Sequence, residues 1–190
     1  ALPISAGSIT LATDADQTTG SGDIRMLAGV DITLGGVITT TGSVSLTTDT
    51  GSIFDGDSDG SVDIIAAALR VDTLTFGSLV NFIETDLINI SVSTSVGGIY
   101  VDDTASIAVA SVSAVVSRVR ADASITLVSD AAQSGLAAVA GDIFVTAAGD
   151  ISVMGVITPG DITLVATNGA ILDGGNAVTD LDAGGRVSLT

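Results

Sequence analysis

The chain has 190 residues, 46% of them hydrophobic, and a formal net charge of −17 at pH 7. The apolar content is enough for a folded core and argues against disorder, while so acidic a surface argues against binding to nucleic-acid phosphates. Cysteine and histidine are both absent from the sequence, which removes disulfides, Ser-His-Asp and Cys-His catalysis and the usual zinc sites.

Short segments of apolar, polar and apolar residues recur along the chain, each after Gly, Ser or Asp. In chain order they begin at residues 8, 22, 31, 43, 141, 150 and 161. Alternation with a period of two places the apolar side chains on one face of a strand. The only Glu is Glu84, so nearly all of the acid is Asp, which favours turns over helices. The sequence therefore predicts an all-β chain of short strands.

The order of these segments also repeats over a longer distance. Residues 22–39 return as 141–158, 42–56 return as 160–174, and a third match relates 8–17 to 124–133. A long repeat made of strand-turn units predicts a parallel β-solenoid. We expect one continuous solenoid over residues 1–190 of a larger protein, with a long unit at about 1–120 and a partial second unit at about 121–190. At about 20 residues per coil it would make roughly nine coils and a rod on the order of 45 Å long.

Residues 161–175 resemble the repeats of filamentous-haemagglutinin-like giant adhesins, and residues 82–86 followed by 97–101 resemble another coil of the same kind. The resemblance implies a right-handed parallel β-helix, export by a Gram-negative bacterium and a place on the outside of the cell. It implies no catalytic residue. Tandem β-sandwiches remain an alternative architecture, because the long unit is close to one sandwich domain in size.

The function that follows is structural: a rigid extracellular stalk or spacer of a large bacterial surface adhesin, not an enzyme. Its expected partners are neighbouring repeats of the same chain, with host or neighbouring-cell glycans or proteins as further candidates, and neither nucleic acid nor a membrane span. The exposed strand edges at the two ends of the rod predict end-to-end stacking. The alternative is a calcium-dependent adhesive module that binds a glycan or a protein, and a polysaccharide-degrading β-helix enzyme is third.

One motif could hold a metal ion. Asp55, Asp57 and Asp59 alternate with other residues, and Gly60 and Asp63 follow. This pattern resembles the start of an EF-hand or dockerin-type calcium loop, in which oxygen ligands on a tight turn suit a hard cation. The sequence thus offers these four aspartates as a candidate calcium site, with a solvated Asp-Gly turn as the alternative.

Two acidic pairs could act in glycan cleavage: Asp102 with Asp103, and Asp180 with Asp182. Against such a role, the five Arg are scattered and Lys and Trp are absent from the sequence. We therefore interpret both pairs as exposed turn residues.

Overall fold

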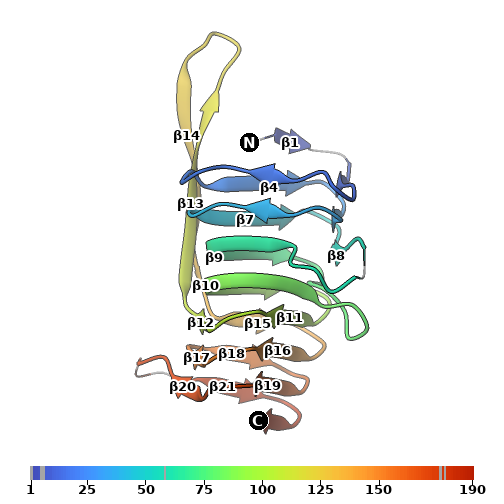
Figure 1. The fold of residues 1–190 in the computed structure, drawn as a ribbon, viewed down its shortest axis with the longest axis vertical. Coiled ribbons are helices and arrows are strands. Elements are labelled where there is room, and N and C mark those ends of the chain that lie inside the picture. The colour runs from blue at the N-terminus through green and yellow to red at the C-terminus, as the bar shows by residue number, and fades with distance from the viewer. Residues whose placement is uncertain (1, 5–6, 58, 176, 178) are drawn as a thin grey trace.

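The computed structural model describes all residues except 1, 5–6, 58, 176 and 178, and it shows strands and no helix in the part of the chain that it describes (Figure 1). The strands are β1 Leu2–Ile4, β2 Ile9–Leu11, β3 Gln17–Thr18, β4 Ile24–Ala28, β5 Ile32–Leu34, β6 Ile38–Thr39, β7 Ser43–Thr48, β8 Ile53–Asp55, β9 Ile64–Thr73, β10 Ile83–Thr94, β11 Ile99–Asp103, β12 Ile107–Val109, β13 Ser111–Val119, β14 Ile125–Ser134, β15 Leu136–Ala138, β16 Ile143–Ala147, β17 Ile151–Val153, β18 Val156–Thr158, β19 Ile162–Ala166, β20 Ile171–Asp173, β21 Leu181–Ala183 and β22 Val187–Leu189.

Nearly all of these strands pair in parallel with the strand one coil away, which makes a parallel β-solenoid of about eight turns. Side one contains β2, β5 and β8 and continues through β11, β16, β19 and β22. Side two begins with β3 and β6 and continues into the first halves of β9 and β10. Side three contains β1, β4, β7 and the second halves of β9 and β10, and then the short strands β12, β15, β17, β18, β20 and β21.

The core consists of rows of apolar side chains that run along the solenoid axis, one residue from each turn. The row on side one is Ile9, Ile32, Ile53, Phe76, Ile99, Ile143, Ile162 and Val187. Its six inner members, from Ile32 to Ile162, are fully buried. Period-two alternation sends every second residue of a strand inward, and β-branched side chains pack well on such a surface. The side-one row is therefore a continuous apolar stack through the interior.

Aspartates that precede the strands link each coil to the next. Asp31 Oδ1 accepts a hydrogen bond from the backbone N–H of Ser52 at 2.8 Å, and Asp150 Oδ1 accepts one from Ala170 at 2.8 Å. The same contact joins Asp23 to Ser43, Asp142 to Asp161, and Asp161 to Arg186. The repeated Asp therefore has a structural reason: it satisfies a backbone N–H of the following coil at a corner where no strand pairs.

One segment leaves the solenoid. β13 and β14 pair antiparallel and form a hairpin, inserted between β12 and β15. The hairpin crosses β10, β9, β7 and β4 on side three, and its tip extends past the N-terminal coil (Figure 1). Its inward residues Val112, Ala114 and Val116 are buried against the solenoid.

Polar contacts fix the position of this hairpin along the solenoid axis. Asp130 Oδ2 accepts hydrogen bonds from Arg25 Nε at 2.8 Å and from Ser45 Oγ at 2.7 Å, and Gln133 Nε2 donates to the carbonyl of Val71 at 2.8 Å. Burial by itself would raise the pKa of Asp130, but the hydrogen bonds from Arg25 and Ser45 lower it on balance. The aspartate therefore stays ionised and paired.

The predicted all-β parallel solenoid is confirmed, and the stack of aligned single strands excludes tandem sandwiches. The coil number falls to about eight from the expected nine, because residues 111–134 form the hairpin and add no coil. The third pair of matching segments takes different places in the structure: residues 9–11 lie in the solenoid as β2, whereas residues 125–127 lie in the hairpin strand β14.

Candidate metal centre

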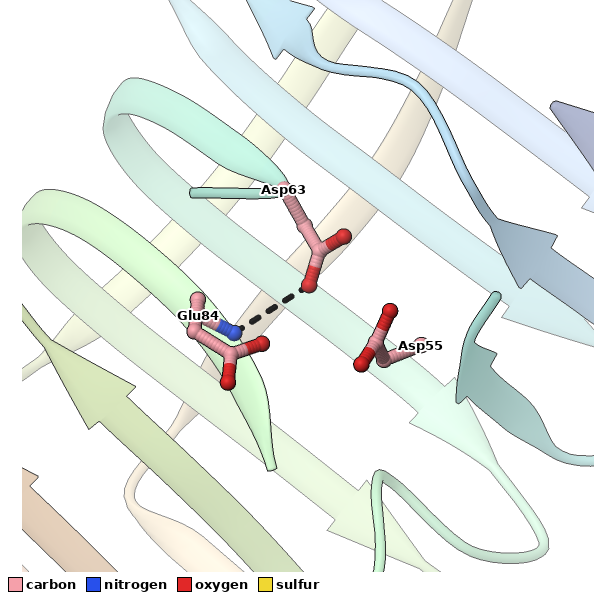
Figure 2. A group of neighbouring side chains, drawn as sticks. All are labelled: Asp55, Asp63 and Glu84. Carbon is pink, nitrogen blue, oxygen red and sulfur yellow. Dashed lines mark hydrogen bonds between the residues drawn. The ribbon is translucent and has the colours of Figure 1, made fainter. Parts of the chain in front are cut away.

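Three carboxylates converge at the corner between side one and side two. Asp55 ends β8, Asp63 directly precedes β9, and Glu84 lies in β10 one coil further on. The backbone N–H of Asp63 donates to the carbonyl of Glu84 at 2.9 Å, and the N–H of Glu84 donates to Asp63 Oδ2 at 3.2 Å. These two bonds place Glu84 directly beside Asp63, and Figure 2 shows the carboxylates of all three residues facing one another.

The geometry of this acidic cluster, Asp55, Asp63 and Glu84, fits a cation. One carboxylate oxygen from each residue lies within 4.8 Å of the other two. Ligand oxygens lie about 2.4 Å from Ca²⁺, so two ligands of one ion can be as much as about 4.8 Å apart. Asp55 and Asp63 are 8% and 4% exposed. Oxygen Oε2 of Glu84 is buried and has no hydrogen-bond partner among the residues that the structure describes.

The raised pKa values of two carboxyls in the cluster also favour a cation site. Burial, followed by the charge of Asp55, raises the pKa of Asp63 to about 8. The same two causes raise the pKa of Glu84. Neither Asp63 nor Glu84 has a basic partner within the described ranges, where the ion pairs lie at other places. Buried carboxylates that lack a basic partner either take up a proton or bind a metal ion, because their negative charge is poorly solvated.

The cluster contains only two of the four aspartates that the sequence offered as calcium ligands, Asp55 and Asp63. Asp57 and Asp59 lie on the outer loop: the N–H of Asp57 donates to Asp55 Oδ1 at 3.0 Å, and Asp59 Oδ1 accepts from the N–H of Ser61 at 2.7 Å. These contacts form successive tight turns, and the bond from Ser61 lowers the pKa of the exposed Asp59. Asp57 and Asp59 therefore shape the loop, and the closing carboxylate comes from another coil.

Glu84 was missed from the sequence, although one signal could have identified it. It is the only Glu in a chain whose other acidic residues are all Asp. A longer side chain is needed there because Glu84 must reach across one coil to the carboxylates of Asp55 and Asp63.

The two acidic pairs do not form comparable sites, and the interpretation of all four as exposed turn residues is wrong for Asp103, which is buried at the end of β11. Asp103 points into the solenoid, where its carboxylate accepts hydrogen bonds from Thr85 Oγ1 at 2.8 Å and from the N–H of Leu87 at 3.0 Å. Asp102 is exposed on the opposite face of the same strand. Asp182 is exposed, and Asp180 Oδ1 is buried without a hydrogen-bond partner in the described part of the chain.

Fold and site together define this chain as a parallel β-solenoid of about eight turns that carries a largely buried acidic cluster. No protein family, curated protein or solved structure matches it. Within the described residues, no helix is long and apolar enough to cross a membrane.

Proposed function

We propose that the chain is a stiff spacer in a large bacterial surface adhesin, located outside the cell, where it holds an adhesive part away from the surface. The observation that carries this proposal is the continuity of the rows: one apolar side chain from each turn stacks on the next from Ile9 to Val187. Bending such a stack would open backbone hydrogen bonds and expose apolar surface on one side.

Three further features support a mechanical role. The aspartate contacts add hydrogen bonds between coils at the corners, where strand pairing stops. The hairpin spans several coils and is fixed to them by the half-buried pair of Arg25 and Asp130. The net charge of −17 keeps rods apart and in solution.

A display experiment tests the spacer. The 190-residue chain is placed between an unrelated cell-surface anchor and a small binding domain, and the height of that domain above the surface is measured by fluorescence. A flexible Gly-Ser linker of equal length is the control, since its ends stay close together on average. We expect the solenoid to hold the domain at a fixed height that the linker does not reach. Equal heights, or adhesion by the solenoid without the domain, would contradict the proposal.

The acidic cluster favours a second candidate function, a calcium-dependent adhesive module. Calcium at Asp55, Asp63 and Glu84 would hold the loop after β8 in one conformation and so present its outer surface to a glycan or protein. The test is binding of the chain to glycan arrays and to cells, in calcium and in chelator. Binding that needs calcium and is lost in Asp63→Asn but kept in Asp59→Asn would support this candidate, and calcium-independent binding would refute it.

A further inference from the structure

Most of the aromatic side chains lie on the outside of the solenoid. The chain has four Phe, one Tyr and no Trp. Phe76 is fully buried in the side-one row, and the other buried apolar residues are all aliphatic. The remaining aromatic residues are Phe54, Phe82, Tyr100 and Phe144. Each precedes or follows a buried residue in its strand, so alternation sends its ring outward. Packing of the core therefore does not account for these four rings.

Phe82, Tyr100 and Phe144 form a cluster on side one, here called the aromatic strip. Tyr100 and Phe144 are register partners in β11 and β16. Phe82 directly precedes β10, and its ring meets both of the others nearly at right angles, with centroids 6.0 Å from Tyr100 and 5.2 Å from Phe144. The ring of Tyr100 lies across Gly98, where a Cβ would come within 2.8 Å of its Cε2 and 2.9 Å of its Oη. These contacts hold the rings in fixed orientations.

Further apolar side chains extend this surface. Phe54, Gly77 and Tyr100 follow one another along the outside of side one, because the residues before them are paired from coil to coil. Phe54 is 42% exposed. A tight turn, closed by two backbone hydrogen bonds, begins directly after Gly77, and its tip carries Leu79 and Val80, which are 62% and 93% exposed. An exposed group of aromatic and aliphatic side chains of this kind marks a binding surface.

A row of polar side chains runs beside the aromatic strip. Its members lie two residues after the three rings and are register partners on the same outer face: Glu84, Asp102 and Thr146. Burial, followed by the charge of the exposed Asp142, raises the pKa of Tyr100, so its hydroxyl stays protonated. The strands β10, β11 and β16 contain neither Arg nor Lys. The surface therefore combines aromatic rings with hydrogen-bond acceptors and hydroxyl groups, and these strands supply no positive charge.

This combination suits a sugar better than a protein. One face of a sugar ring is made of C–H groups and packs on an aromatic ring, while the hydroxyl groups at its edge donate hydrogen bonds to carboxylates. Acidic sugars and sulfate groups would be repelled, because Glu84, Asp102 and Asp142 are all negative when ionised. The centre of a protein interface is instead depleted of Asp and Glu, whereas here carboxylates lie beside the rings.

We propose that the aromatic strip binds an uncharged glycan, which lies along the solenoid axis with its sugar rings on Tyr100 and Phe144 and its hydroxyl groups toward Asp102. The direction follows from the two parallel rows, since rings and acceptors are both repeated from coil to coil at a spacing of about 4.8 Å. This proposal rests on the second candidate function, in which the chain itself binds a ligand, but it does not require calcium. It deepens that candidate by naming the ligand class and the surface that holds it.

Affinity electrophoresis of the 190-residue chain tests the strip against uncharged glucans, mannans and galactans, with polygalacturonate and heparin as acidic probes. We expect at least one uncharged polysaccharide to retard the chain and the acidic ones to have no effect. Tyr100→Ala with Phe144→Ala should weaken binding by at least about tenfold, and Tyr100→Phe should keep most of it. Asp102→Ala should also weaken binding, and because Asp102 is exposed this variant keeps the fold. The control, Ile88→Ala with Ile157→Ala, shortens two exposed side chains away from the strip and should change nothing.

Each measurement is made in calcium and in chelator, which separates the strip from the calcium-dependent module. Binding that the Tyr100→Ala, Phe144→Ala variant loses supports the strip in either buffer, and equal binding in both buffers refutes only the calcium requirement. Binding that this variant retains would overturn the strip, as would a chain that binds no uncharged polysaccharide or binds the acidic ones equally well. Binding to cells that survives periodate oxidation of their glycans but not protease treatment would assign the surface to a protein partner and overturn the proposal.

Discussion

Asp63→Asn should change the stability of the solenoid in opposite directions with and without calcium. Asn has nearly the same shape, and its Oδ1 can still accept the hydrogen bond from the N–H of Glu84, so the substitution removes charge with little change in packing. In chelator, the raised pKa of Asp63, about 8, means that ionising this carboxyl opposes folding. Asp63 contributes most to folding stability when its carboxyl is protonated, below pH 3.8, the ordinary pKa of Asp. This contribution is lost as the pH rises toward 8.

The magnitude follows from this pKa. Each unit of difference between folded and unfolded pKa corresponds to about 1.4 kcal/mol, which gives an upper limit of roughly 6 kcal/mol. The outer side of Asp63 borders a shallow hollow shared with Asp57, Asp59 and Ser61, so solvent screens part of the charge. With that screening we expect about 2–3 kcal/mol, or roughly 5–10 °C in melting temperature for a chain of this size.

The assay is a thermal melt followed by circular dichroism in chelator, at about pH 4 and about pH 9. Asp63→Asn should match wild type at the lower pH and be more stable at the higher pH. Asp59→Asn is the control, because Asp59 is exposed and outside the cluster. In calcium at 100 times the dissociation constant, wild type should gain about 2.7 kcal/mol, and the Asn variant should gain clearly less. A variant that is no more stable than wild type in chelator at the higher pH would refute this account of the cluster.

Three further predictions concern a contact between coils, the core row on side one and the attachment of the hairpin. Asp31→Ala should lower stability by about 1 kcal/mol in a thermal melt, because the N–H of Ser52 loses its acceptor, whereas Asp31→Asn should have little effect; equal losses would contradict the role of the acceptor. Phe76→Ala should cost about 3–5 kcal/mol, since it empties the fully buried centre of the side-one row, and a loss below about 1 kcal/mol would show that the row can collapse. Hydrogen exchange should show the hairpin loosening as the pH falls below 3.8, the ordinary pKa of Asp, because the pKa of Asp130 is lowered and its pairing with Arg25 is lost only in acid. Asp130→Asn should loosen the hairpin at neutral pH. Protection equal to wild type in that variant would contradict the pairing.

The fold could be predicted from the sequence because one short motif specifies both a hydrogen bond between coils and the side chains that face the core. The Asp of residues 31–34 accepts a hydrogen bond from the next coil, and the two apolar residues point into the core. Both requirements are local, so they can be read from four residues. The core rows follow from the same motif, since each coil repeats it in register.

The hairpin could not be predicted, because its strands have the same pattern. Residues 111–114 alternate polar with small or apolar residues as the solenoid strands do, and every second residue from Val112 to Val116 is buried. Alternation shows that one face is buried but says nothing about the partner or its direction. A strand of a parallel coil and a strand of an antiparallel hairpin therefore have the same sequence pattern, and only the three-dimensional structure distinguishes them.

The third carboxylate of the cluster was missed for a related reason. Glu84 lies 21 residues after Asp63, and it meets Asp63 only because that separation is one coil. The coils vary in length, so the sequence does not say which distant residue stacks on which. The long repeat has the same limit: residues 42–46 and 160–164 match in sequence, yet β7 lies on side three and β19 on side one.

The aspartate contacts between coils do not explain the net charge of the rod. An asparagine oxygen could accept the same N–H bond, so the contacts between coils do not require ionised side chains. The charge of −17 must therefore matter for another property of the molecule, and its distribution indicates which one. Exposed aspartates occur from Asp14 near the N-terminus to Asp182 near the C-terminus, whereas Arg118 and Arg120 lie near the turn of the hairpin. Like charges oppose side-by-side contact between rods. In the proposed spacer, this acidic surface would keep neighbouring rods from forming bundles.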